Sequence, residues 1–209
     1  MDTSLSIGHY LEELSSNSPT PGGGNVSAFC GSLASSLGIM VCNLSIGKKK
    51  YVDSEEELKV LMKKLERAKD EFLALSEEDN KAFDQVMEAF KLPKETDAQK
   101  SIRSKKIEEA TIVAGVVPFR VICLCKTIIP AFMIIAEKGN QNSLSDAGVA
   151  ISLISTAAQG AFLNILINCS SYKDNVRAKD ILSKSESDFT EVKDTCRKGL
   201  ELIEKKLSG

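Results

Sequence analysis

The chain has 209 residues, of which 43% are hydrophobic, 27% charged and 5% aromatic, and its formal net charge is −2. This length and apolar content predict one domain, residues 1–209, with a substantial buried core. The near balance of acidic and basic residues and the few aromatic side chains argue against a nucleic-acid partner. Six cysteines are scattered without the spacing of a disulfide framework or zinc site, so we expect free thiols in a reducing compartment.

The N-terminal segment and one apolar stretch bear on the location of the protein. The chain begins Asp2-Thr3-Ser4 and lacks the basic region and apolar segment of a secretory signal, so we expect a cytoplasmic protein. Ala110–Ala136 is apolar enough to raise the question of a membrane, but charged residues and prolines interrupt it: Pro118, Arg120, Lys126 and Pro130. Buried, proline-kinked helices and no membrane partner are therefore expected.

The N-terminal quarter predicts a helix, a loop and a second helix. Apolar residues at intervals of three and four predict a short helix ending near Ser15, namely Ile7, Tyr10, Leu11 and Leu14. Two prolines and three glycines in Ser16–Gly24 predict a loop of defined shape. Many small residues in Asn25–Ile46 indicate a buried helix that its neighbours approach closely.

A long helix is predicted after the lysine run at residues 48–50. Asp53 or Ser54 offers an N-cap, and Ser54 with Glu57 matches a capping box. The following apolar residues have the three-four spacing of bundle packing: Leu58, Leu61, Leu65, Ala68, Phe72, Leu75, Ala82, Val86 and Ala89. Asp79 takes the place of the apolar residue that this spacing requires between Leu75 and Ala82.

The second half predicts further helices and no strand. A polar connection, Lys91–Lys100, precedes helices over Ile102–Val117 and Phe119–Glu137, which Pro118 and Gly139 delimit. We expect a small-residue helix with Ser145 or Asp146 as its N-cap to run to about Ser171, and a last helix to start near Asp174. The predicted fold class is all-α, a multi-helix bundle with long and proline-kinked helices.

Several short motifs occur in an order that points to a known family. They are Pro19–Gly24, Gly47-Lys48-Lys49 with Tyr51, Asp79–Phe83, Arg103 with Val117-Pro118, Gly139-Asn140, Ser145–Ala150, and Asn164-Ile165-x-x-Asn168 with Asp174. Together they resemble the cyclodeaminase/cyclohydrolase family, whose domain occurs fused to a formiminotransferase or alone as methenyltetrahydrofolate cyclohydrolase. The resemblance covers roughly Leu11 to Asp174, and Phe119 stands where the family usually has leucine.

The resemblance implies an α-helical homodimer that acts on tetrahydrofolate derivatives. The implied reaction converts 5-formiminotetrahydrofolate to 5,10-methenyltetrahydrofolate and ammonia, or interconverts the 5,10-methenyl and 10-formyl forms by hydrolysis, and the sequence leaves both open. Each is a proton-transfer problem that requires no metal and no cofactor. A noncatalytic helical assembly or folate-binding domain is the alternative.

Asp79 is the candidate catalytic residue, because a carboxylate on an apolar bundle stripe is costly to bury without a partner or ligand. The alternative is a structural aspartate paired with lysine or arginine. His9, the only histidine, is expected to be exposed, and a multi-histidine metal site is therefore excluded. No metal ligand set is predicted.

Candidate substrate-binding residues fall into three groups. Gly22, Gly23 and Gly24 precede a helix whose free N–H groups suit an anionic or carbonyl oxygen, or they form only a tight turn. Cations that suit the folate carboxylates, or that are merely solvated, are Lys48, Lys49 and Arg103. Amides and a carboxylate complete the set: Asn140, Asp146, which as an N-cap would be structural, and Asn164 and Asn168, which could bind the pterin or each other.

Self-association is the last expectation. The helices predicted over Asn25–Ile46 and Asp146–Ser171 carry enough small residues to permit close approach across a two-fold axis. By the resemblance, the folate site lies near that interface. Gly22–Gly24 and Asp79 are both expected there, from one subunit or from two.

Overall fold

The computed structural model describes residues 6–209; the Asp2–Ser4 start that entered the prediction on secretion lies outside the described residues. The described chain is helical and contains no strand, which confirms the all-α prediction. It forms seven α-helices: α1 (Ile7–Leu14), α2 (Gly23–Asn43), α3 (Glu55–Phe90), α4 (Asp97–Ala114), α5 (Val116–Lys138), α6 (Leu144–Cys169) and α7 (Val176–Ser208). Short 3-10 turns lie at Lys49–Ser54, Gln141–Ser143 and Ser170–Tyr172.

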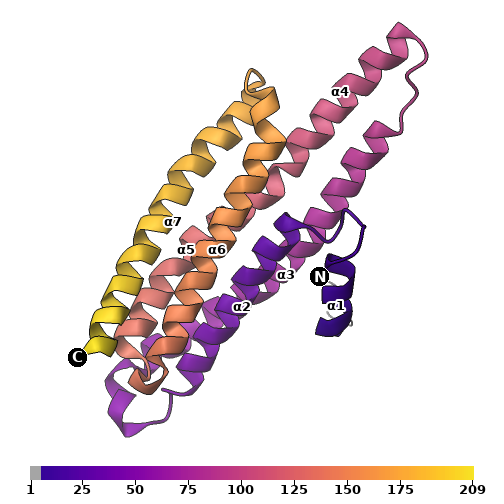
Figure 1. Ribbon diagram of the computed structural model, residues 1–209. Helices are drawn as coiled ribbons and strands as arrows, with labels where there is room; N and C mark the ends of the chain where they lie inside the picture. Colours follow the sequence, from indigo (N-terminus) through magenta and orange to yellow (C-terminus); the bar gives the residue numbers. More distant parts are fainter. Residues whose placement is uncertain (1–5) are drawn as a thin grey trace.

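The helices form an elongated bundle in which α2 packs against α3 and α6, and α6 also packs against α5 and α7 (Figure 1). α1 lies to one side, and Tyr10 is its only buried residue. The core is built from aliphatic and small residues with a few aromatic rings. Its largest fully buried side chains are Phe72, Phe132, Leu58, Leu65, Leu75, Ile122, Ile128, Ile135, Ile151, Ile154, Ile165 and Val41.

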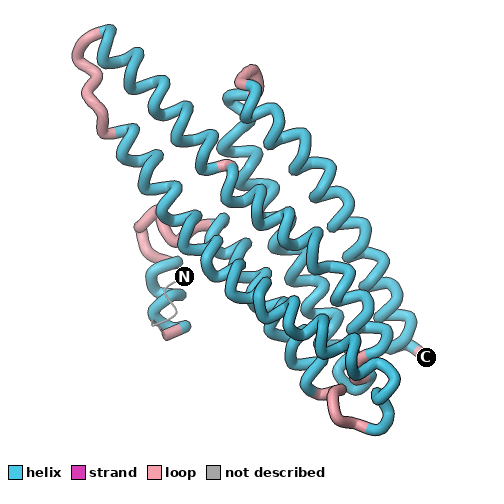
Figure 2. The backbone as a smooth tube through the Cα atoms, turned by 180° about the vertical axis from the view of Figure 1, so that it is seen from behind, coloured by secondary structure: helices cyan, strands magenta, loops and turns pink. Residues whose placement is uncertain are grey.

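The predicted apolar stripe of α3 is confirmed, but its burial changes along the helix. Leu58, Leu65 and Phe72 are 0% exposed, whereas Ala82, Val86 and Ala89 are 8–9% exposed. The change occurs because α3 and α4 extend beyond the other helices as a projecting hairpin (Figures 1 and 2). The C-terminal part of α3 therefore has fewer neighbours than its N-terminal part.

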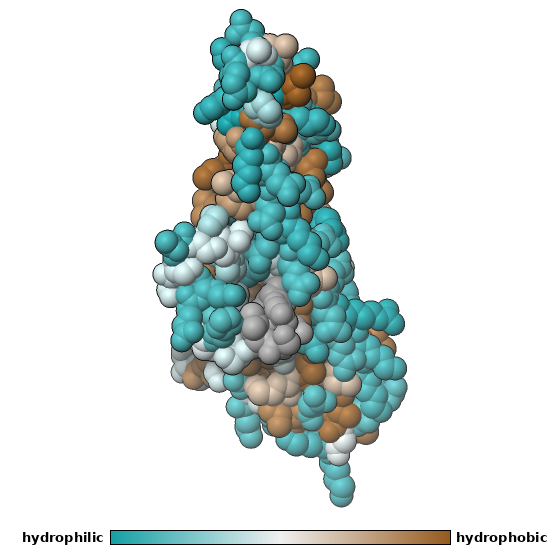
Figure 3. All heavy atoms as spheres, turned by 90° about the vertical axis from the view of Figure 1, so that its right-hand side faces the viewer, coloured by the Kyte–Doolittle hydropathy of each residue, from teal (hydrophilic) through white to brown (hydrophobic). Residues whose placement is uncertain are grey.

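The tip of this hairpin differs from the predicted connection. α4 begins at Asp97, because Thr96 and Gln99 form a capping box, so the loop is shorter than Lys91–Lys100. Phe90 and Ile102 remain 47% and 60% exposed near the tip. In Figure 3 apolar atoms are interspersed with hydrophilic ones along the projecting part.

One predicted capping box and two predicted helix boundaries are wrong for identifiable reasons. Ser54 has helical dihedral angles and forms no cap hydrogen bond, and Glu57 instead contacts Lys138 at 2.8 Å. The break between α4 and α5 falls at Gly115, because Pro118 is accommodated in the first turn of α5, where N–H groups need no helical partner. α6 begins at Leu144 with Ser143 as its N-cap, so neither Ser145 nor Asp146 is the cap.

Proline and membrane-related features of the apolar helices complete the description. Pro130 lies inside α5; a kink there stays a prediction. By length and composition three helical stretches could cross a membrane, Gly23–Asn43, Asp97–Lys138 and Gln141–Tyr172. Part of the apolar surface of α2 and α6 is not covered by this chain: Leu33, Val149, Leu163 and Ile167 are 42–77% exposed.

Candidate functional site

One pocket of about 340 Å³ brings together most of the predicted site residues. Its size lies in the range of small-molecule sites in proteins. The N-terminus of α2 and the preceding loop form one wall, α3 and the end of α4 form the second, and α6 forms the third. The lining residues are Pro19, Thr20, Gly22, Gly23, Gly24, Asp79, Phe83, Val86, Ala114, Asn164, Ile167 and Asn168.

The loop before α2 shapes this pocket and opens the helix end toward it. Gly22 is the N-cap of α2, and the first hydrogen bond of the helix joins the Val26 N–H to the Gly22 carbonyl at 3.0 Å. The N–H groups of Gly23, Gly24 and Asn25 therefore have no helical acceptor. The Thr20–Pro21 peptide bond is cis. The positive end of a helix dipole thus faces the pocket.

Gly24 allows the Asp79 carboxylate to approach the helix end. A Cβ atom at this position would lie 2.6 Å from Asp79 Cγ, closer than real side chains come. A Cβ at Gly23 would lie 3.3 Å from Asn164 Nδ2 on α6. Gly24 and Asp79 of one chain therefore meet directly, and a site shared between two subunits stays a prediction.

Asp79 is partly buried and lies against the N-terminus of α2, where a Cβ at Gly24 would meet its carboxyl. Burial raises the pKa of its carboxyl above the usual value, and the nearby Asn25 N–H opposes this rise in part. No ion pair joins Asp79 to a lysine or arginine among residues 6–209. The ion-paired structural aspartate of the alternative hypothesis is thus not what the structure contains.

Two asparagines of α6 face Asp79 across the pocket. Asn164 donates from Nδ2 to the Gly160 carbonyl at 2.9 Å, which leaves its side-chain oxygen available to the pocket. Asn168 follows one turn later and also lines the pocket. The pair offers amide donors and acceptors of the kind that a pterin ring requires.

The other predicted binding residues do not line this pocket in a single chain. Asn140 is buried at the opposite end of α2, where it accepts from Tyr51 at 3.2 Å and donates to the Leu44 carbonyl at 3.1 Å. Lys48 and Lys49 precede Tyr51, and Asp146 lies in the first turn of α6 at that same end of the bundle. All three are placed away from Asp79.

Arg103 lies on the projecting hairpin. Its guanidinium donates to the Phe90 carbonyl from Nε at 3.2 Å and from Nη2 at 3.0 Å, and it stacks over the Phe90 ring. This contact ties α4 to the last residue of α3. Arg103 therefore has a structural partner, and its predicted contact with folate carboxylates stays a prediction.

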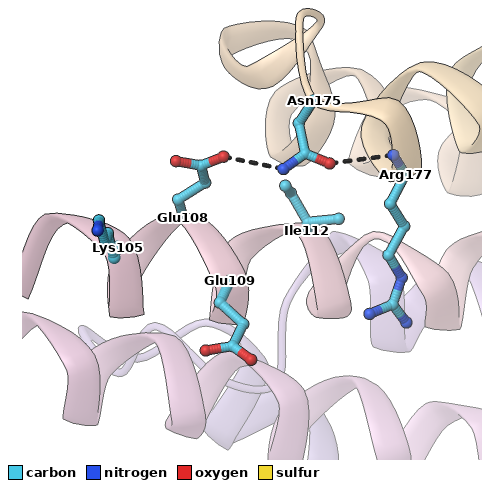
Figure 4. A pocket seen from close by; sticks show the side chains of 6 residues that line it. All are labelled: Lys105, Glu108, Glu109, Ile112, Asn175 and Arg177. Atoms are coloured by element: carbon cyan, nitrogen blue, oxygen red, sulfur yellow. Dashed lines mark hydrogen bonds between the residues drawn. The ribbon is translucent and has the colours of Figure 1, made fainter. Parts of the chain in front are cut away.

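A second hollow, about 260 Å³ in volume, lies between α4 and the segment that leads into α7 (Figure 4). Its carboxylates have partners: Glu108 accepts from Asn175 Nδ2 at 3.0 Å, and Glu109 contacts Lys106 at 2.9 Å. The hydrogen bond from Lys106 lowers the pKa of Glu109. None of the predicted site residues lines this hollow.

Sequence reasoning missed a buried hydrogen bond behind the pocket. Tyr10 donates its hydroxyl hydrogen to Asn25 Oδ1 at 2.8 Å, and Asn25 is 0% exposed. Tyr10 was visible only as an apolar helix position. Asn25 could have been noticed as an amide directly after three glycines at the start of a buried helix.

The arrangement suits proton transfer to a ligand that the helix end and the amides hold. A carboxyl group with a raised pKa and no cationic partner can accept and return a proton. No cluster of three or more His, Cys, Asp or Glu that could hold a metal ion occurs among residues 6–209. The fold and pocket thus define an all-helical protein with one partly buried carboxyl in a cavity of ligand size.

Comparison with known proteins identifies the family. The formiminotransferase-cyclodeaminase family model matches residues 6–187, so the chain belongs to this family. It is 41% identical over 177 residues to the methenyltetrahydrofolate cyclohydrolase of Methylorubrum extorquens. This match covers 85% of each of the two chains. It is 30% identical over 168 residues to the formimidoyltransferase-cyclodeaminase of Gallus gallus, covering 80% of this chain and 31% of that protein.

A solved structure supports the same assignment. The formiminotetrahydrofolate cyclodeaminase of Thermotoga maritima superposes with a TM-score of 0.80 at 30% sequence identity. The match covers 95% of this chain and 97% of that chain. The bundle, including the elements that form the pocket, is therefore the fold of this family.

Proposed function

We propose that the protein is an enzyme of folate one-carbon metabolism that hydrolyses 5,10-methenyltetrahydrofolate to 10-formyltetrahydrofolate, with Asp79 as its acid/base group. The observation that carries the proposal is the Asp79 carboxyl, partly buried in a ligand-sized pocket without a cationic partner. The likeness to a cyclohydrolase over 85% of both chains supports hydrolysis as the reaction.

The substrate supplies the positive charge that the pocket lacks. Its 5,10-methenyl bridge is a cationic amidine, and Asp79 is the only ionisable side chain among the described lining residues. The carboxylate takes a proton from water as the oxygen adds to the bridge carbon. It then returns a proton to N5 as the C–N5 bond breaks, and the second water proton is released when the formyl group forms on N10.

Cyclodeamination of 5-formiminotetrahydrofolate is the second candidate, favoured by the TM-score of 0.80 to a cyclodeaminase. Here N10 attacks the carbon of the protonated, cationic formimino group, and Asp79 takes the proton that N10 loses. The same group protonates the departing nitrogen, which leaves as ammonia. Because both reactions use one acid/base group beside the same carbon, the pocket supports either.

Purified protein offered each substrate separately distinguishes the reactions. Loss of the methenyl absorbance on hydrolysis, and its gain from the formimino substrate, are the two readouts. We expect hydrolysis to be faster and to persist with chelator present, as the metal-free and cofactor-free predictions require. Binding of both folates without turnover would instead support the noncatalytic folate-binding alternative.

The proposal includes a homodimer formed through the outer face of α2 and α6. Leu33 lies near the middle of α2, and its exposed side chain is accompanied by Val149 and Leu163 on α6. Uncovered apolar surface of this kind favours a second copy, because small residues permit close approach. A two-fold axis perpendicular to α2 near Leu33 sets the partner's Lys48 end against the Asp79 pocket of this chain.

Such a dimer explains why the predicted binding residues lie at two ends of one chain. Lys48 and Lys49 of one copy then provide cations for the folate carboxylates bound at the Asp79 pocket of the other. Each site needs Asp79 from one chain and the lysines from its partner. A chain that lacks Asp79 and a chain that lacks the lysines should therefore complement each other.

Mixing Asp79→Asn chains with Lys48→Glu/Lys49→Glu chains tests the shared site. Half of the randomly formed dimers are mixed and one of their two sites is intact, so about a quarter of wild-type activity should return. Light scattering reports the dimer directly. A monomer with full activity, or no recovery of activity in verified mixed dimers, contradicts the shared site. Neither result bears on the proposed reaction at Asp79, which the substrate assay tests separately.

A further inference from the structure

A hydrogen-bonded network behind the pocket links three helices to Asp79. Asn25 lies at the start of α2, Tyr10 on α1, and Ser76 and Asn80 on α3, one turn before and one residue after Asp79. Neither Tyr10 nor Asn25 lines the pocket. Their role in a reaction at Asp79 must therefore be indirect.

The contacts fix the orientation of the Asn25 amide. Its Nδ2 donates to the Ser76 carbonyl at 2.8 Å, and a backbone carbonyl oxygen can only accept. The amide nitrogen therefore faces α3, where it also lies 3.3 Å from Asn80 Oδ1. Asn25 Oδ1 faces Tyr10, whose hydroxyl must donate to it. The amide is thus oriented by its partners.

The backbone at this end of α2 lies against Asp79. A Cβ at Gly24, the residue before Asn25, would lie 2.6 Å from Asp79 Cγ, and the Asn25 N–H lowers the pKa of that carboxyl. The Asn25 side chain is held on α3 at Ser76 and Asn80, on either side of Asp79. The side-chain contacts set the position from which the N–H reaches the carboxyl, and α1 contributes through its only buried residue, Tyr10.

We propose that Tyr10 and Asn25 are positioning residues for Asp79, which hold the α2 N–H group on the carboxyl and thereby tune its proton affinity. The inference rests on the proposed acid/base role of Asp79. Loss of the Tyr10 hydroxyl leaves Asn25 Oδ1 without its donor and loosens the residue. The weakened hydrogen bond then stabilises the charged carboxylate less.

The other ionisable groups around the network have their own partners or remain neutral. On α1, His9 lies within 3.8 Å of Glu12 and 3.4 Å of Glu13 at the surface. On α3, Glu78 is paired with Arg120 of α5. On α2, burial raises the pKa of the Cys30 thiol, which keeps it uncharged at neutral pH. The α6 residues that face Asp79 are the uncharged Asn164 and Asn168.

The Tyr10→Phe variant tests the inference, because it removes one hydroxyl from a ring that also packs edge-on against Phe29. In protein labelled with ¹³C at aspartate carboxyl carbons, the Asp79 signal is assigned by its loss in Asp79→Asn. We expect its pKa to shift upward by about half a pH unit or more. We also expect kcat to fall about tenfold with little change in KM, since Tyr10 does not touch substrate.

Asn25→Ala should raise the pKa of Asp79 by more than Tyr10→Phe does. If the alanine variant does not fold, the Tyr10→Phe result alone tests the inference. Ser185→Ala is the matched control, because it removes a buried hydroxyl hydrogen bond on α7. It should lower Tm without moving the Asp79 signal. A folded Tyr10→Phe protein with unchanged Asp79 pKa and kcat overturns the inference, even if Asp79→Asn is inactive. Full activity of Asp79→Asn refutes the proposed function instead.

Discussion

The hollow at Glu108 and Glu109 and the pocket at Asp79 both contain carboxyl groups, and they differ in what surrounds those groups. Glu108 and Glu109 lie at the surface of α4 and have an amide and a lysine as partners. Asp79 is buried deeper, has no cation, and is held by a backbone N–H. The pKa of Glu109 is lowered and that of Asp79 is raised. Both carboxyls lie in hollows, so the presence of a cavity does not distinguish them. Asp79 is the candidate acid/base group because it is buried without a cationic partner, whereas Glu109 has one.

The difference between the two hollows is tested most directly by neutralising one carboxyl in each. Asp79→Asn should lower turnover about 10²-fold or more while the helical far-UV signal is retained, because the acid/base group is lost. Glu109→Gln should keep near wild-type turnover. Steady-state kinetics on both variants provide the test, and comparable losses in the two would remove the distinction between the hollows.

Gly24→Ala should have the next largest effect. Its Cβ would lie 2.6 Å from Asp79 Cγ, so the carboxyl must move away from the helix end. We expect turnover to fall about tenfold or more, as for a catalytic group displaced from its position. Gly148→Ala is the control, since its Cβ would meet Ile203 at an ordinary 3.4 Å. Equal activity of the two variants would show that the close approach at Gly24 is not needed.

Asp79 and Glu109 should change the pH dependence of the protein's stability in opposite directions. The folded state raises the pKa of Asp79, so its stabilising effect is present below the unfolded pKa and is lost as pH rises through the folded pKa. Asp79→Asn should therefore gain Tm relative to wild type as pH increases from acid to neutral. Glu109 has a lowered pKa, so the Tm of Glu109→Gln should be slightly below that of wild type at neutral pH and equal to it in acid. Melting curves across this range supply the measurement.

Arg103→Ala should have the smallest effect of the four. Its guanidinium is partly exposed and already binds the Phe90 carbonyl, so a contact with substrate carboxylates would be a weak, solvent-screened one. We expect KM for a polyglutamylated substrate to rise about two- to fivefold with kcat unchanged. A monoglutamate substrate is the matched comparison, and an equal KM change for both would favour a structural role.

The sequence predicted the helices well and the contacts between them poorly. The α3 stripe was readable because bundle packing repeats every three or four residues, and Asp79 was conspicuous as its interruption. The capping box at Thr96 was missed, while the one at Ser54 was predicted and does not form. Both have the same residue pattern, and only the backbone conformation at the first residue distinguishes them.

The sequence pointed to several residues that line the pocket, but not to the way in which they meet. Gly24, Asp79 and Asn164 meet because α2, α3 and α6 pack side by side, a pairing that helix periodicity does not encode. Asn140 carries an equally suggestive amide, yet it lies at the other end of α2. Asn25 escaped notice because its importance comes from tertiary contacts to Tyr10 and Ser76.

The projecting α3–α4 hairpin divides a single helix into two stability regimes. Backbone amides near Leu58 and Phe72 lie in the packed bundle, whereas those beyond Val86 have little besides α4 for support. Local opening should therefore cost less toward the tip, and amide hydrogen exchange should quicken along α3 from bundle to tip. Asp79 lies where the two regimes meet, so one wall of its pocket belongs to the packed bundle and the wall of Phe83 and Val86 adjoins the part that opens more easily.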